Sequence, residues 1–149
     1  MSKLIEISET PTVTAGAYHA KDAVGGLLTF ENAASVYKGS GWIRKVVIIN
    51  QAGVADLLNL WLFNQTFTAA ADNAAFDPSD ADNLHCLGRI SIVAADYEVA
   101  NDNAVATVLC NFPFALVAGG TSLFGQFECE ATPTYAAVTD LTVILTIER

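Results

Sequence analysis

Apolar and polar residues alternate with a period of two along much of this chain. The clearest case is the stretch LTVILTIE, where Leu141, Val143, Leu145 and Ile147 share one face and threonines and Glu148 take the other. This pattern is typical of a strand with one buried face. The preceding stretch TSLFGQFECE alternates in the same way, and the turn-rich ATPTYAAVTD joins the two. We therefore expect two sequential antiparallel neighbours at the C-terminal end.

Six further segments have the composition of strands, and glycine-containing stretches such as YKGSG and VAGGT separate them. About eight strands with no alternating long helices predict an all-β chain built as an antiparallel sandwich or barrel. The absence of a linker or repeat predicts a single domain over residues 1–149. The six segments are 4–9, 23–30, 42–50, 56–64, 89–99 and 104–112.

The longest interruption of the strand pattern contains the stretch FDPSDAD. Asp77 followed by Pro78 matches a helix N-cap followed by proline at the first helical position. Asp80 then falls at the third position, where a carboxylate favours the helix dipole. Gly88 can end the turn, so the sequence predicts one short helix near 77–87.

A calcium loop is the competing interpretation of the same carboxylates, Asp77, Asp80 and Asp82. Such a loop needs oxygen ligands at alternate positions, a glycine at the bend and a closing glutamate. Pro78 stiffens the backbone here and no glutamate follows. We expect a helix cap and no metal, and calcium dependence would reverse that choice.

The charge composition narrows the possible partners. Only 15% of the residues are charged, against about 25% in a typical protein, and 52% are apolar, which favours a surface that assembles with partners over a well-coated monomer. The net charge of −9, with scattered bases, argues against direct nucleic-acid binding and against an anionic membrane surface. The first ten residues lack the apolar run of a signal peptide, and no segment is long enough to span a membrane.

No recognisable catalytic motif occurs in the chain, so we expect no enzyme activity and no cofactor. The three cysteines, Cys86, Cys110 and Cys129, lack metal-site spacing and are expected to be buried free thiols of a protein made in a reducing cytoplasm. Glu128 and Glu130 share a strand face, as paired carboxylates of a glycosidase could, but two solvent-facing acids on an edge strand are the simpler interpretation.

Aromatic residues supply the candidates for a partner interface. In DLLNLWLFN, Trp61 and Phe63 share the face opposite the leucines, so the strand is either covered on both faces or presents them to a partner. Trp42 follows a glycine turn, near the predicted rim of the sandwich. Tryptophan is enriched at interface hot spots, although core packing accounts for each of the three as well.

Three long stretches carry a resemblance to a known group of proteins: GAYHAKDAVGGLLTFENAA, LLNLWLFNQTFTAAADNAAFDPSDAD and TSLFGQFECEATPTYAAVTDLTVILTIER. Together they resemble small auxiliary head proteins of tailed bacteriophages, also called cement or decoration proteins. The resemblance implies a jelly-roll-like fold and a closing hairpin in TPTY…TDLTV. It implies a virion protein on the capsid exterior that binds major capsid protein, stabilises the head, and forms a homo-dimer or homo-trimer.

Two other functions stay open from the sequence. One is a β-module elsewhere in the virion, such as the head–tail connection or the baseplate. The other is a carbohydrate-binding sandwich in which Trp42 or Trp61 stacks on a sugar.

Overall fold

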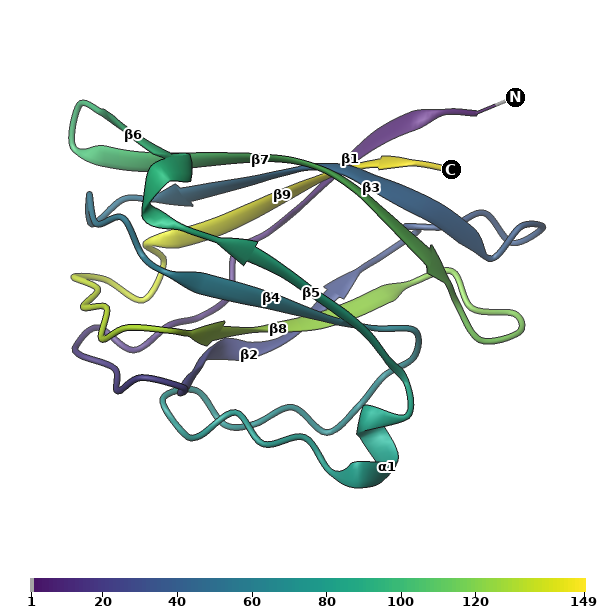
Figure 1. Cartoon of the computed structure of the whole chain (residues 1–149), viewed down its shortest axis with the longest axis horizontal. Coiled ribbons are helices and arrows are strands. Elements are labelled where there is room, and N and C mark those ends of the chain that lie inside the picture. Colours follow the sequence, from purple (N-terminus) through teal and green to yellow (C-terminus); the bar gives the residue numbers. More distant parts are fainter. Residues whose placement is uncertain (1) are drawn as a thin grey trace.

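The computed structural model describes residues 2–149, which form two packed antiparallel sheets (Figure 1). One sheet has five strands in the order β1-β9-β3-β7-β6, and the other has four in the order β2-β8-β4-β5. The elements are β1 (Leu4–Glu9), β2 (Ala23–Phe30), β3 (Ser40–Asn50), β4 (Leu58–Phe63), α1 (Asp80–Asn83), β5 (Cys86–Ile92), η1 (Ala94–Asp96), β6 (Tyr97–Ala100), β7 (Asn103–Ala115), β8 (Leu123–Cys129) and β9 (Leu141–Glu148).

Eight of these strands form four antiparallel pairs nested within one another. The outermost pair is β1 with β9, followed by β2 with β8, β3 with β7 and, innermost, β4 with β5. This nested order, rolled into two sheets, is that of a jelly roll. The ninth strand, β6, extends the first sheet as a short hairpin with β7. The predicted all-β, jelly-roll-like sandwich is therefore confirmed, with nine strands instead of about eight.

The expected pairing of the last two strands is wrong. β8 lies in the four-stranded sheet between β2 and β4, whereas β9 lies in the five-stranded sheet between β1 and β3. Segment 130–140 crosses from one sheet to the other, so there is no closing hairpin. Alternation reports that each strand has one buried face, but it does not report which strand lies beside it.

The core lies between the inner faces of the two sheets. The alternating residues of β9 that were assigned to one face are all fully buried, and Leu58, Leu60 and Leu62 of β4 face them from the other sheet with no exposed surface. A run of large aliphatic side chains of this kind supplies most of the hydrophobic stabilisation.

The outer face of the four-stranded sheet is covered by the loop that joins β4 to β5. Phe67 stacks on Phe63 with ring centroids 3.8 Å apart, and Phe76 stacks on Trp61 at 5.7 Å. Beneath the same loop, the buried amide of Gln126 donates to the carbonyl of Ala70 over 2.8 Å. β4 is thus covered on both faces, which explains why its sequence is apolar on both.

The predicted helix exists but is shorter and begins later. α1 spans Asp80–Asn83, and its N-cap is Ser79, whose hydroxyl accepts from the amide of Asp82 at 3.1 Å. Asp77 is therefore not the cap. Pro78 directly precedes the cap residue Ser79, and Asp80 occupies the first helical position. The predicted end near residue 87 fails because β5 begins at Cys86 and pairs with β4. No helix within residues 2–149 is long and apolar enough to cross a membrane.

At Gly125 the backbones of β8 and β4 approach closely, and this predicts the effect of a substitution. A Cβ at this position would lie 2.7 Å from the carbonyl oxygen of Trp61, whereas a Cβ at Gly26 would meet nothing within 4 Å. We expect Gly125→Ala to lower the free energy of unfolding by roughly 1–3 kcal/mol, because β8 must move away from β4. Gly26→Ala is the matched control and should change it by less than ~1 kcal/mol. Urea denaturation measures both, and equal effects would contradict the close approach.

Candidate functional site

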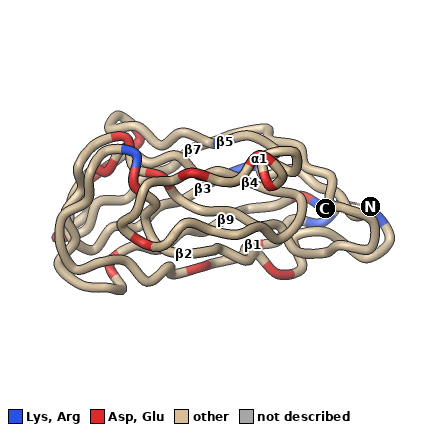
Figure 2. The backbone as a smooth tube through the Cα atoms, turned by 90° about the horizontal axis from the view of Figure 1, so that it is seen from below, with Lys and Arg blue, Asp and Glu red and all other residues tan. Residues whose placement is uncertain are grey.

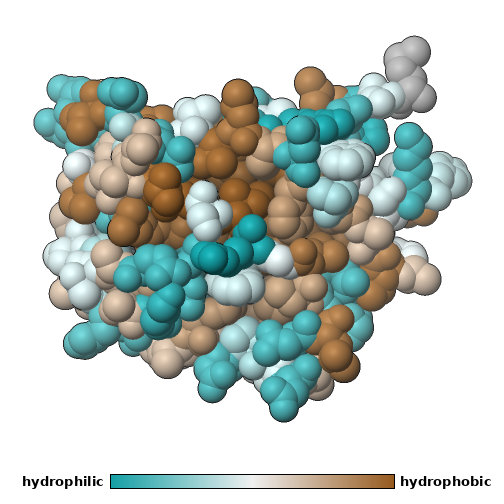
Figure 3. All heavy atoms as spheres, viewed as in Figure 1, coloured by the Kyte–Doolittle hydropathy of each residue, from teal (hydrophilic) through white to brown (hydrophobic). Residues whose placement is uncertain are grey.

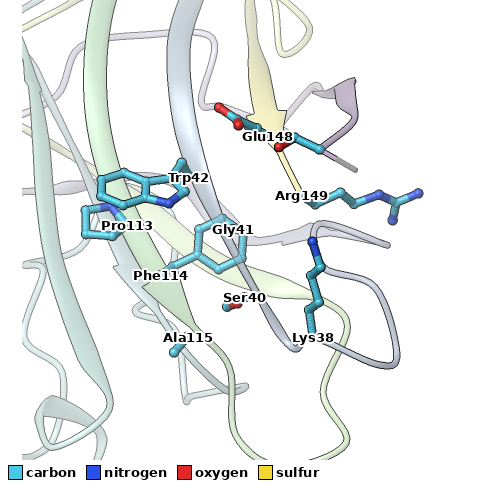
Figure 4. Close-up of a pocket in the computed structure, with 10 residues that line it drawn as sticks. Lys38, Ser40, Gly41, Trp42, Pro113, Phe114, Ala115, Glu148 and Arg149 are labelled. Atoms are coloured by element: carbon cyan, nitrogen blue, oxygen red, sulfur yellow. The ribbon is translucent and has the colours of Figure 1, made fainter.

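Two adjacent hollows lie at the end of the sandwich where β1 begins and β9 ends. Each has a volume of about 420 Å³, and Lys38 and Arg149 line both. The first is lined by Ser2, Lys38, Ser40, Gly41, Trp42, Pro113, Phe114, Ala115, Glu148 and Arg149. The second is lined by Lys3, Asn32, Ala34, Ser35, Val36, Tyr37, Lys38, Thr121 and Arg149. Figure 4 shows Lys38 and Arg149 on the side of the first hollow away from Trp42 and Pro113, with the ring of Phe114 between.

Two glycines at the start of β3, Gly39 just before it and Gly41 within it, shape the first hollow. Gly39 has a φ of +62°, which turns the chain into β3, and its carbonyl accepts from the amide of Leu116 at 2.7 Å. At Gly41 a Cβ would lie 2.8 Å from the carbonyl oxygen of Glu148 and 2.9 Å from the ring of Phe114. Glycine is therefore required for this ring to lie directly against the β3 backbone.

Trp42 is held at the rim by a neighbouring cation. The guanidinium of Arg44 lies 4.9 Å from the centre of the Trp42 ring, a cation–π arrangement. Arg44 also donates to Glu148 over 2.6 Å and to Asn111 over 2.5 Å, and its hydrogen bond to Glu148 lowers the pKa of that carboxyl. Trp42 remains 42% exposed, so the sequence-based interface candidate does lie on the surface.

Bases without an acidic partner gather at this end of the molecule. Lys21, Arg44 and Arg89 form ion pairs with Glu130 or Glu148. Lys3, Lys38, Lys45 and Arg149 form none with another side chain among residues 2–149, and all of these except Lys45 line the hollows. In Figure 2, basic segments accordingly lie beside both termini, in a chain with more than twice as many acids as bases.

Sequence reasoning missed these bases because no local pattern marks them. Lys3, Lys38 and Arg149 are far apart in the sequence, and the bases looked scattered. The outermost strand pair brings Lys3 beside Arg149, since each backbone amide donates to the other residue's carbonyl at 2.9 and 3.0 Å. Tyr37, 97% exposed in the same loop as Lys38, was likewise not singled out.

The other two aromatic candidates are placed differently. Phe63 is fully buried beneath Phe67, so it offers no surface to a partner. Trp61 is half-buried beneath Phe76, and its indole N–H donates to Glu128 over 3.1 Å. Tertiary covering by the β4–β5 loop accounts for both side chains.

The two glutamates that share a strand face are engaged in a polar network. The expectation of solvent-facing acids on an edge strand is wrong for Glu128, which is only 8% exposed on the central strand β8, whereas Glu130, just beyond the end of β8, is exposed. The amide of Asn59 donates to Glu128 over 3.0 Å and to Glu130 over 2.5 Å. Hydrogen bonds from Lys21 and Asn59 lower the pKa of Glu130. Both carboxylates thus serve as acceptors that join β8 to β4.

Thiols and imidazoles do not converge within the described chain. All three cysteines are free; Cys129 is buried and the other two are half-buried. Burial raises the pKa of the Cys110 and Cys129 thiols, which disfavours the reactive thiolate. Among residues 2–149, no group of three or more His, Cys, Asp or Glu side chains is placed to hold a metal ion.

A buried polar cluster lies at the opposite end of β3 from the hollows. Asp56 is 3% exposed, and its Oδ2 accepts from the Asn50 amide over 2.7 Å. Its Oδ1 and the buried hydroxyls of Tyr97 and Tyr135 have no partner in hydrogen-bonding geometry within residues 2–149. Burial raises the pKa of Asp56 to about 6, and it raises the pKa of both tyrosines.

Comparison with known proteins gives no family assignment. No family model and no curated protein matches the chain. Among solved structures, a chain titled Desmodium yellow mottle tymovirus is similar with 13% identity and a TM-score of 0.29, covering 99% of this chain and 81% of that one. A chain from the native virion of Kashmir bee virus has 13% identity and a TM-score of 0.26, with coverages of 98% and 67%. A chain from the full particle of Israeli acute paralysis virus has 11% identity and a TM-score of 0.24, and the match covers 98% of this chain and 68% of that one. TM-scores of this size carry no inference, so the fold rests on the strand order of the chain itself.

The buried Asp56 predicts a pH dependence of stability. Because its folded pKa of about 6 lies above the ~3.9 of an unfolded chain, its contribution to stability is lost as pH rises from about 4 to 6. Asparagine cannot ionise, so we expect Asp56→Asn to gain up to about 3 kcal/mol of unfolding free energy relative to the natural protein across this window. Urea denaturation from pH 4 to 7 measures the difference. Asp77→Asn, at an exposed site, is the control, and parallel profiles for Asp56→Asn and the natural protein would contradict the prediction.

Proposed function

We propose that this chain is a structural protein of a virus particle, a cement or decoration protein that binds the outside of a phage head between major capsid subunits. The observation that carries the proposal is the gathering of unpaired bases around exposed aromatic rings at one end of a strongly acidic sandwich. Aromatic side chains framed by charge are typical of protein–protein contacts. The jelly-roll topology and the resemblance of three long stretches to phage head proteins support the same function.

Such a protein would act by shifting the assembly equilibrium of the capsid and not by catalysing a reaction. A ligand that binds the assembled shell but not separated subunits shifts the equilibrium toward the shell. Many symmetric copies then add modest interface energies across one particle. A rigid sandwich suits this role because its contact surface loses little conformational freedom on binding.

The fold alone does not choose this function, since jelly rolls serve many purposes. A protein at another position in the virion could dock through the same surface, the two hollows lined by Lys38 and Arg149 with Trp42 at the rim, and would differ only in its partner. Carbohydrate binding retains one candidate, Trp42, because Phe76 stacks over Trp61. We propose no enzyme activity, because Glu128 and Glu130 are engaged as acceptors from Asn59.

We further propose that the protein forms a homo-dimer or homo-trimer through an apolar strip between β7 and β5. Figure 3 shows apolar side chains gathered on this face, between the two strands. The strip contains the half-buried Leu87, Val108 and Phe112, which also pack against the core. Copies with the same net charge of −9 meet with least repulsion where the surface carries no charge, and residues 107–115 contain none.

The proposed contact predicts that removal of the exposed aromatic rings weakens binding to heads. We expect Trp42→Ala to weaken co-sedimentation with purified heads by about 30-fold, the size of a ~2 kcal/mol hot spot. Tyr37→Ala removes a 97% exposed ring with no packing to lose, and it should weaken binding in the same direction. Val99→Ala, 70% exposed on β6, is the control. Heads that bind all of these proteins equally well, or that never bind the natural one, would refute the proposal.

A charge placed in the apolar strip should separate the copies. We expect the natural protein to be a dimer or trimer by size-exclusion chromatography with light scattering, unchanged by EDTA. Val108→Lys, at a half-buried position in the strip, should give a monomer, because each association would then bury a lysine without a partner. Leu84→Lys, at the 84% exposed C-cap of α1 and outside β5 and β7, should keep the assembly. A monomeric natural protein would argue against the strip as an interface.

A further inference from the structure

We infer that the two hollows together receive one extended acidic segment of a partner protein, with its carboxylates at Lys38 and Arg149 and an apolar side chain against Trp42. The inference deepens the proposed function and rests on it only for the partner being a capsid protein. The two hollows share Lys38 and Arg149, so an occupant that satisfies these bases lies in both.

The donors available at this junction suit carboxylates. Arg149 uses one guanidinium nitrogen to donate to the carbonyl of Asn32, which leaves further N–H groups of its five for a ligand. A guanidinium binds a carboxylate through two parallel hydrogen bonds, whereas Lys38 and Lys3 act as compact positive charges. None of the three forms an ion pair with a side chain of residues 2–149, although acids outnumber bases in the chain.

The floor and rim of the hollows suit a peptide better than a nucleic acid. Phe114 and Trp42 give the first hollow an apolar side, and the carboxylate of Glu148 lies at its rim, already paired with Arg44. A phosphate backbone needs a continuous row of bases and would meet both Glu148 and the net charge of −9. A peptide instead alternates side chains, so acidic residues can reach the bases while an apolar one lies on Trp42.

The dimensions of the site favour an extended chain. Each hollow, at about 420 Å³, is within the usual range for a bound ligand, and the two lie next to each other around the shared bases. A single small anion would occupy only the junction between them. An extended segment of several residues fills both hollows and brings successive carboxylates to Lys38, Arg149 and Lys3.

The test uses a fluorescein-labelled peptide of six glutamates and one leucine, measured by fluorescence anisotropy at about 50 mM and 150 mM salt. We expect binding by the natural protein, weakened at least tenfold by Lys38→Glu or by Arg149→Glu. Lys45→Glu is the matched control, because Lys45 is also unpaired but lies outside the hollows, on the open face of the five-stranded sheet. It should change the affinity less than threefold, since salt screens charges beyond about 8–10 Å.

Absence of peptide binding, or an equal loss in Lys38→Glu and Lys45→Glu, would overturn the inference. Displacement of the peptide by a single-stranded oligonucleotide at lower concentration would also overturn it, in favour of nucleic acid. The co-sedimentation assay with heads separates this outcome from the proposed function. Peptide binding without head binding would refute the role in the head and leave the acidic-segment site standing, and the reverse result would refute the site alone.

Discussion

The nested antiparallel pairing of strands is the constraint on which the rest of the structure depends. Each strand buries one face, so it must lie in a sheet packed against another sheet, and the pairing of β1 with β9 encloses every other pair. The innermost connection is then the long loop between β4 and β5. This loop crosses the outer face of its own sheet, where Phe67 stacks on Phe63 and Phe76 stacks on Trp61.

The same pairing decides where charge accumulates. Because the first and last strands are partners, Lys3 and Arg149 become neighbours, and the loop before β3 carries Lys38 to the same end. No local sequence motif distinguishes Lys3, Lys38 and Arg149 from the other bases of the chain. A surface built in this way depends on topology, and only a structure reveals it.

The sequence predicted the features that depend on one strand at a time and missed those that depend on two. Alternation in 141–148 gives the buried face of β9 correctly, but the same evidence cannot distinguish a hairpin partner from a strand in the other sheet. Glu128 looked solvent-facing because the loop that covers its sheet is distant in sequence. The sequence places the helix cap two residues early because Asp77 and Ser79 are both acceptable caps, and it places the helix end too late because β5 already pairs with β4 from Cys86.

The proposed docking surface is separable from the parts that keep the chain folded. Its geometry comes from backbone features, the turn at Gly39 and the close approach at Gly41. Of its ligand-facing groups, Lys38 is exposed, whereas Arg149 is half-buried and hydrogen-bonded to Asn32. The buried polar groups that constrain the fold lie elsewhere, around Asp56 at the far end of β3 and around Asn59 on the covered sheet. Substitutions that reverse charge at Lys38 therefore change what the surface attracts without removing a core contact, so a loss of binding there reports on recognition and not on unfolding.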